Sequence, residues 1–167
     1  SAEENIPDMM ESAQELQEDD RPKEAEAIYK KILERSPRHL EAQYELATSM
    51  MNRSVETEDL DLLYQAIQEN KKVIDIFKGH GEAYDNLAYC YYILKDYKTS
   101  YGYLLKANRR GVRNKFLRER LKIHLITDRG KSPESGSKAR ITPLKKPQKT
   151  TAPISSDDEL GGGLINT

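Results

Sequence analysis

Apolar residues recur at helical spacing in seven stretches of the chain, and polar or helix-breaking residues separate these stretches. Within residues 23–35 one such stripe comprises Ala25, Ile28, Tyr29, Ile32 and Leu33. Pro22 stands where a helix needs no N–H donor, and Ser36-Pro37 ends the stretch because proline disfavours helix at the residue before it. The pattern predicts an all-α chain with helices at about 8–18, 23–35, 40–51, 59–77, 82–94, 97–108 and 115–127.

Three pairs of small or apolar residues mark a repeat, namely Ser12-Ala13, Leu46-Ala47 and Leu87-Ala88. Ala13 and Ala47 lie 34 residues apart, and Ala47 and Ala88 lie 41 apart. The longer spacing contains seven additional residues, 52–58, which are polar enough either to loop out or to extend a helix. Repeats of this period are typical of binding proteins rather than of enzymes.

The residues at these intervals resemble the tetratricopeptide repeat family. The first repeat has Ala13, Arg21-Pro22-Lys23-Glu24-Ala25, Tyr29 and Pro37, and the third has Tyr84, Leu87-Ala88, Tyr91, Lys95-Asp96-Tyr97 and Ala107. The middle repeat departs from the pattern through its insertion and through Asn70, which stands where an aromatic residue is usual. The resemblance implies a right-handed superhelix of three helix pairs over residues 1–128, with repeats at about 6–39, 40–80 and 81–114 and a capping helix at 115–127.

A narrower resemblance concerns residues 41–47, 62–67 and 72–73, which are similar to the tetratricopeptide region of aspartyl/asparaginyl β-hydroxylase. In that family the region lies in the endoplasmic reticulum lumen and precedes an iron- and oxoglutarate-dependent domain. No such domain is present in this chain. The resemblance implies a substrate-guiding arm or truncated form of a lumenal hydroxylase, as the alternative to a cytoplasmic, free-standing adaptor.

The family pattern implies that the first helix of each pair lines a concave groove. The side chains at the groove positions are Met10, Gln14, Gln17, Tyr44, Thr48, Met51, Asp85, Tyr89 and Tyr92. We expect an apolar, aromatic groove with few charges that binds a helical or extended peptide, since Met adapts its shape and Tyr offers a large contact area. In the alternative interpretation, Tyr89 and Tyr92 pack under a neighbouring helix or the C-terminal tail.

One use of the family can be argued against from the same positions. Repeats that bind the acidic C-terminus of heat-shock chaperones clamp its carboxylates with Lys, Asn and Arg. This chain has Met10 and Gln14 at the first two of those positions and Glu82 and Asn86 at the last two. Because Glu82 would repel the ligand, we do not expect binding of chaperone tails.

The charges are distributed unevenly along the chain. Residues 1–26 contain ten acidic side chains and two basic ones. Residues 109–122 contain one acidic residue, Glu119, and seven basic ones. The basic residues are Arg109, Arg110, Arg113, Lys115, Arg118, Arg120 and Lys122. The opposite ends either orient a charged partner or simply keep the array soluble. Only Phe116 interleaves the basic run with an aromatic ring, so we expect a protein or peptide partner rather than nucleic acid.

The sequence offers little catalytic chemistry. His39, His80 and His124 are widely separated and lack partners at metal-ligand spacing, so we expect surface or loop positions and no metal or cofactor. The single cysteine, Cys90, lies among apolar residues and is expected in the core, and no apolar run is long enough to span a bilayer. These observations predict a non-catalytic interaction protein.

Residues 129–167 differ in composition from the rest of the chain. Gly, Ser, Pro, Thr and Lys dominate, which predicts a disordered tail. A further hypothesis is that Leu144, Ile154 or Leu160 folds back into the groove as an internal ligand.

Overall fold

The computed structural model describes residues 3–127, which form seven α-helices and no strand. The helices are α1 (Ile6–Glu18), α2 (Pro22–Arg35), α3 (Leu40–Glu56), α4 (Leu60–Ile76), α5 (Gly81–Ile93), α6 (Tyr97–Arg109) and α7 (Lys115–Thr127). The prediction of an all-α chain is confirmed for these residues, and most helix ends lie within two residues of the expected positions. The predicted tail, residues 129–167, lies outside the described residues.

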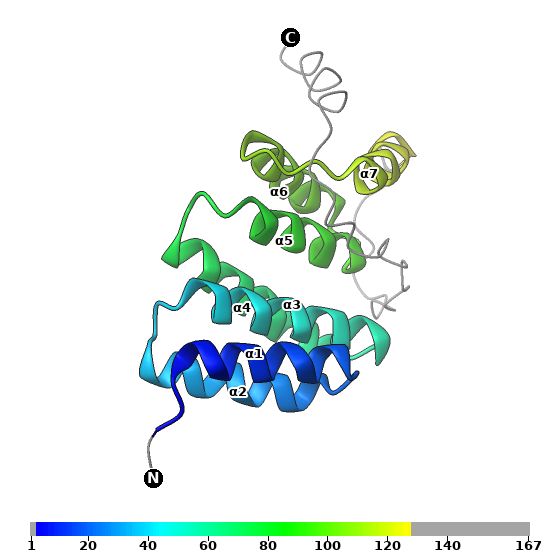
Figure 1. Ribbon diagram of the computed structural model, residues 1–167. Coiled ribbons are helices and arrows are strands. Elements are labelled where there is room, and N and C mark those ends of the chain that lie inside the picture. Colours follow the sequence, from blue (N-terminus) through cyan, green and yellow to red (C-terminus); the bar gives the residue numbers. More distant parts are fainter. Residues whose placement is uncertain (1–2, 128–167) are drawn as a thin grey trace.

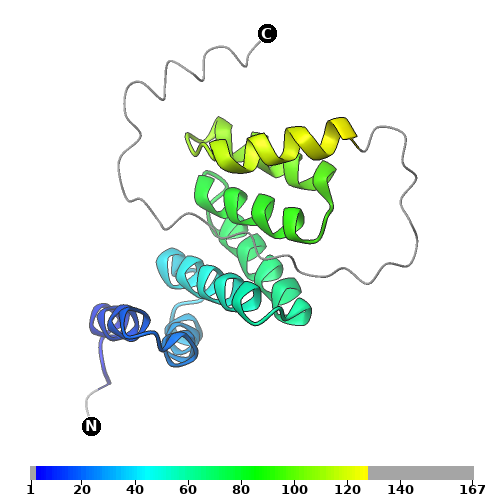
Figure 2. The ribbon, with the colours of Figure 1, turned by 90° about the vertical axis from the view of Figure 1, so that its right-hand side faces the viewer.

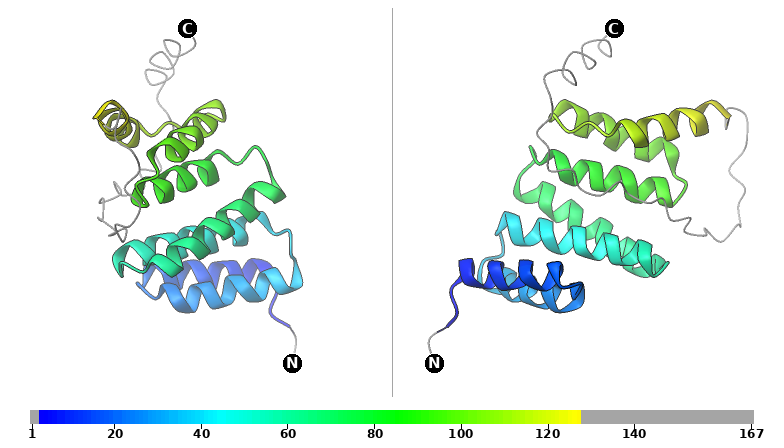
Figure 3. Two further views of the ribbon diagram at one scale, coloured as in Figure 1. Left: turned by 180° about the vertical axis from the view of Figure 1, so that it is seen from behind. Right: turned by 45° about the vertical axis from the view of Figure 1, so that its right-hand side comes forward.

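The helices stack as pairs in two layers. The odd-numbered helices α1, α3, α5 and α7 follow one another in one layer, and α2, α4 and α6 form the other (Figures 1 and 3). Figure 2 shows α1 and α2 end-on but α7 lengthwise, so the helix directions rotate along the stack. The acidic N-terminal segment and the basic C-terminal helix therefore lie at opposite ends of the array.

The same tight turn joins the two helices of each pair. Helices α1, α3 and α5 are each followed by a residue with positive φ, namely Asp20 at 58°, Glu58 at 53° and Lys95 at 61°. The N–H of the next residue returns to a carbonyl of the last helical turn, as in the 2.8 Å bond from Arg21 N to Leu16 O. This bond satisfies a carbonyl left unpaired at the helix end, which is the Schellman arrangement. None of the three residues is glycine.

The odd helices also begin in the same way. Asn5, His39, His80 and Asn114 each accept the backbone N–H of the residue three positions later, at 2.9–3.2 Å. These caps are 34, 41 and 34 residues apart, so α7 begins where the period places another odd helix. His39 and His80 thus serve as helix caps, a role that their sequence context did not indicate.

The seven-residue insertion extends helices instead of looping out. Helices α3 and α4 have 17 residues each, compared with 13 in α1, α5 and α6 and 14 in α2. The extension carries Arg53, whose Nε and Nη2 donate to the two carboxylate oxygens of Glu26 at 3.1 and 2.9 Å. Glu26 is only 4% exposed, and Ser49 Oγ also donates to it.

Two apolar clusters overlap at α5 and make the stack continuous. The larger cluster extends from α1 to α5 and includes Cys90, which is fully buried as expected. The smaller one joins α5, α6 and α7 around Leu104, Leu117 and Leu121. At the end of α7, Ile126 is 71% exposed.

A polar network occupies the place where the middle repeat lacks its aromatic residue. Asn70 is fully buried in a regular α4, and its Nδ2 donates to Ala66 O at 2.9 Å. Asn86 Nδ2 donates to Asn70 Oδ1 at 3.1 Å and to Thr48 Oγ1 at 3.0 Å. Hydrogen bonds therefore replace ring packing between α3, α4 and α5.

Candidate functional site

The two helix layers differ in charge. Helices α1, α3 and α5 carry nine carboxylates and a single basic residue, Arg53, which is paired with Glu26 of α2. Helices α2, α4 and α6 carry nine basic and six acidic side chains. Negative charge is therefore concentrated on the first three odd helices, whereas α7, the last helix of the same layer, carries four basic residues and one acidic one.

Five carboxylates of the odd helices surround Gln14 and Tyr44 and form what we call the acidic face. They are Glu11, Glu41, Glu45, Glu82 and Asp85. Glu11 and Glu41 border the same hollow, and Glu45, Glu82 and Asp85 all act electrostatically on the hydroxyl of Tyr44. The acidic face thus crosses three consecutive odd helices.

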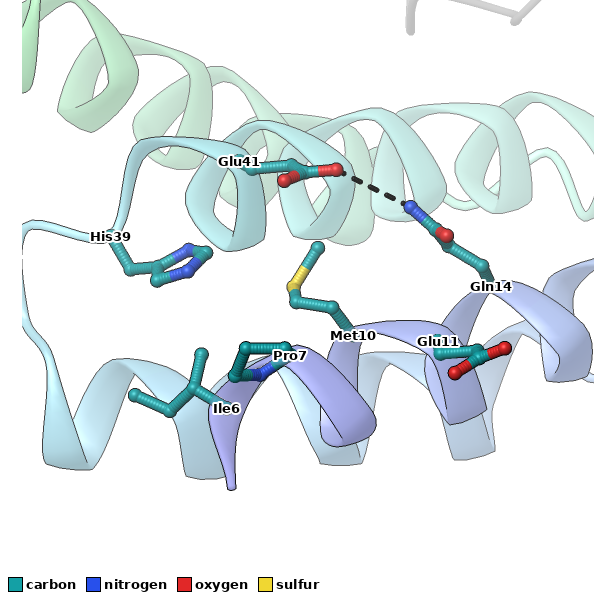
Figure 4. A pocket seen from close by; sticks show the side chains of 7 residues that line it. All are labelled: Ile6, Pro7, Met10, Glu11, Gln14, His39 and Glu41. Atoms are coloured by element: carbon teal, nitrogen blue, oxygen red, sulfur yellow. Dashed lines mark hydrogen bonds between the residues drawn. The ribbon is translucent and has the colours of Figure 1, made fainter. Parts of the chain in front are cut away.

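A hollow of about 450 Å³ lies between α1 and α3 at one end of the acidic face (Figure 4). Its lining residues are Ile6, Pro7, Met10, Glu11, Gln14, His39 and Glu41. The apolar part comes from the first turns of α1, and the side chain of Met10 points from α1 toward α3. Gln14 Nε2 donates to Glu41 Oε1 at 3.3 Å across the seam between the helices. The hollow therefore combines an apolar floor with an acidic rim.

Tyr44 lies further along the acidic face and is half-buried. Its ring centroid is 4.7 Å from that of His80, the residue that caps α5. Burial raises the pKa of Tyr44 to about 12, and the carboxylates of Glu45, Glu82 and Asp85 add to this effect, while a hydrogen bond with Thr48 opposes it. The phenol consequently stays neutral near pH 7 in negatively charged surroundings.

Five of the nine predicted groove residues are buried. They are Met10, Thr48, Met51, Tyr89 and Tyr92. Met51 has no exposed surface and is a core residue, so its assignment to a groove lining is wrong. Burial raises the pKa of Tyr89 to about 12 and also raises that of Tyr92.

Two of these side chains, Thr48 and Tyr92, contact the next odd helix. Thr48 of α3 bonds to Asn86 of α5, and the hydroxyl of Tyr92 lies 3.2 Å from His124 Nε2 of α7. For Tyr92 the alternative interpretation, packing under a neighbouring helix, is therefore confirmed. The expectation of an aromatic surface with few charges is wrong, since α1, α3 and α5 carry nine carboxylates.

The other four predicted residues keep exposed surface. Gln14 is exposed, and Gln17, Tyr44 and Asp85 are half-buried. Asp85 Oδ1 accepts a bond from Asn114 Nδ2 at 3.0 Å, which links α5 to the cap of α7. Asp85 is one of the carboxylates of the acidic face, and Gln14 and Tyr44 lie among these carboxylates. The role of the three residues in binding stays a prediction.

Within residues 3–127, one buried tyrosine of α2 has an unpaired hydroxyl that could not be predicted from the sequence. Tyr29 of α2 is fully buried, and among the described residues its hydroxyl has no hydrogen-bond partner. Burial raises the pKa of Tyr29, and the carboxylates of Glu45 and Glu41 raise it further. The hydroxyl therefore lies within electrostatic reach of the acidic face. The repeat pattern indicated only an aromatic packing residue here, and no sequence signal reveals an unpaired hydroxyl.

No protein-family model matches the chain, and no curated protein matches it. The tetratricopeptide and hydroxylase resemblances thus rest on the residues quoted above and stay predictions.

The predicted basic run is spread over the end of α6, a loop and α7. Arg110 lies 4.1 Å from the ring of Tyr84 and donates to the carbonyls of Lys78 and Lys106, each at 2.8 Å. Arg120 lies 5.3 Å from the ring of Phe116. Arg120 therefore contacts its own helix, whereas Arg110 links the end of α6 to Lys78 and to Tyr84 of α5.

Within residues 3–127, no three His, Cys, Asp or Glu side chains are grouped so that they could hold a metal ion. None of the helices described between these residues combines the length and apolar character needed to cross a membrane.

Proposed function

We propose that this protein is a non-catalytic protein-interaction module of the tetratricopeptide type, and that it binds a peptide segment of its partner on the acidic face. The recurrence of caps and turns supports an array of like helix pairs. Stacked arrays of this kind present extended surfaces to their ligands.

The observation that carries the proposal is the concentration of negative charge on α1, α3 and α5. Nine carboxylates against one paired arginine generate mutual repulsion on these three helices, whereas the even helices mix both signs and α7 is mainly basic. A surface whose charges serve only to keep the protein soluble does not need charges of a single sign. Charged surfaces of one sign favour complementary partners and exclude others.

Site-specific photo-crosslinking tests the proposal. A benzophenone amino acid replaces Gln14 on the acidic face in one version of the full chain, and Tyr64, which is 54% exposed on α4, in another. Each version is irradiated in cell lysate, and the adducts are identified by mass spectrometry. We expect a defined set of adducts from position 14 that position 64 does not give.

Charge reversal provides the control for this experiment. Glu41→Lys/Glu45→Lys should abolish the adducts from position 14, whereas Asp61→Lys/Asp75→Lys on α4 should leave them intact. Circular dichroism verifies that both variants fold. Equal adducts from positions 14 and 64, or equal loss in both reversal variants, would contradict the proposed docking face.

A further inference from the structure

We propose that the acidic face binds a lysine- and arginine-rich peptide segment, one aliphatic side chain of which enters the hollow between α1 and α3. This inference rests on the proposed function and names the chemistry of the partner. It is carried by the charges of the seam and by the floor of the hollow.

The seam holds carboxylates that lack cationic partners. Among the described residues no basic side chain pairs with Glu11 or Glu41, and the partner of Glu41 is the neutral amide of Gln14 at 3.3 Å. The donor of this bond is neutral, whereas an ammonium or guanidinium donor adds Coulombic attraction to the carboxylate and typically approaches it to about 2.7–2.9 Å. A cationic ligand therefore gains by displacing Gln14 from Glu41.

The floor of the hollow explains why an aliphatic group should accompany the cations. Ile6, Pro7 and Met10 supply its apolar surface, and Met10 is flexible enough to fit different side chains. The volume of about 450 Å³ exceeds what one aliphatic side chain needs, so the entering group does not have to match a rigid shape. The acidic rim then places the cations on either side of this group.

The same features argue against other ligand classes. Nucleic acids and phosphopeptides carry negative charge, which the carboxylates of the odd helices repel. An uncharged apolar helix would leave Glu11 and Glu41 desolvated without compensation. A cationic segment satisfies both the carboxylates and the apolar floor.

The chain itself supplies a probe of the required chemistry. Residues 138–149 contain five basic residues and no acidic one, together with Ile141 and Leu144. A fluorescent synthetic peptide of this sequence is titrated with the full chain, and binding is followed by fluorescence anisotropy. The control peptide has glutamine in place of the five basic residues and keeps the aliphatic ones.

We expect saturable binding that is at least about tenfold weaker for the glutamine peptide, and weaker by a similar factor when NaCl rises from about 0.05 to 0.5 M. Equal binding of both peptides, or no binding of the basic one, would overturn the inference. The full chain used in this titration carries glutamine at its own five basic positions within 138–149, so that its own segment does not compete with the peptide.

Variants of the protein locate the site. Glu11→Gln/Glu41→Gln should weaken binding about tenfold, and Gln14→Lys, which places a cation beside Glu41 within the chain, should weaken it as well. The matched control Glu34→Gln/Asp75→Asn removes two exposed carboxylates from α2 and α4 and should leave affinity unchanged. An equal loss in the control would assign binding to net charge alone and overturn the inference.

The two proposals fail in different ways. If the glutamine peptide binds as well as the basic one while position 14 still gives specific adducts, the partner chemistry is wrong but the docking face stands. If adducts arise equally from position 64, the docking face itself is wrong.

Discussion

At the scale of single residues, three non-glycine residues hold a left-handed backbone so that each pair can close. Asp20, Glu58 and Lys95 adopt φ values of 53–61° in equivalent turns. This conformation costs roughly 1–2 kcal/mol for residues with a Cβ atom. The turns therefore retain strain that glycine would remove.

Replacing Glu58 or Lys95 by glycine should stabilise the protein. We expect each variant to raise the free energy of unfolding by about 0.5–1 kcal/mol, since relief of the left-handed strain exceeds the greater entropy of glycine in the unfolded chain. Urea denaturation monitored by circular dichroism measures the change. Glu56→Gly, within the last turn of α3, should instead lower the free energy of unfolding by about 1 kcal/mol. A loss of stability in Lys95→Gly would contradict the interpretation.

The ion pair between Glu26 and Arg53 gives a second prediction at this scale. Removal of the guanidinium in Arg53→Ala leaves a carboxylate that is 4% exposed with Ser49 as its remaining donor. We expect the free energy of unfolding to fall by about 3 kcal/mol, because an uncompensated buried charge is costly. The double variant Glu26→Ala/Arg53→Ala should lose less than the sum of the single variants. Additive losses in the chemical denaturation experiment would show that the two side chains act independently.

At the scale of helices, the start of α5 depends on the protonation state of its cap. His80 Nδ1 accepts the N–H of Ala83 at 3.2 Å and must be unprotonated to do so. Burial lowers the pKa of His80, an effect that Glu82, with an oxygen 3.7 Å from Nδ1, opposes. Because the folded pKa lies below the unfolded value, the stability this group contributes is complete above about pH 6.5 and is lost as the pH falls through the folded pKa.

We therefore expect protonation of His80 to lower the free energy of unfolding between pH 7 and pH 5. This contribution should be absent in His80→Asn. Asparagine caps helices well and does not titrate in this range, so the variant keeps the cap at both pH values. Denaturant titrations at several pH values compare the two proteins, and carboxylates that titrate in both cancel in the difference. A constant difference across this range would mean that the proton on His80 does not control the cap.

The helices themselves were largely predictable from the sequence, whereas the surface was not. The helix ends depend on residues nearby in the sequence, such as Pro22 and Ser36-Pro37, and the Leu-Ala pairs likewise mark the repeat locally. The burial of Met51 and Tyr92 depends on which helix packs next to them. Glu26 resembled a solvated residue of an acidic segment because its partner, Arg53, is 27 residues away in the sequence.

At the scale of the whole molecule, each helix pair is supported mainly by the pairs beside it. The cluster that includes α1 and α2 does not extend to α7, and the cluster around Leu121 involves only α5, α6 and α7. The repeat was visible in the sequence, but the acidic face was not. Helices α1, α3 and α5 are separated along the chain, and their carboxylates come together only when the helices stack. A continuous stack of this kind should lose structure from one end without immediate loss of the other.

Matched cavities at the two ends test this expectation. Ile32→Ala in α2 and Leu121→Ala in α7 each truncate a buried side chain, at a cost of about 2–4 kcal/mol. Under native conditions, hydrogen exchange followed by mass spectrometry should show faster exchange in α1 and α2 for the first variant and in α6 and α7 for the second. The long central helices α3 and α4 should remain the most protected in both. Uniform acceleration over all seven helices in either variant would instead mean that the array unfolds as one cooperative unit, and the acidic face would then be lost whenever either end opens.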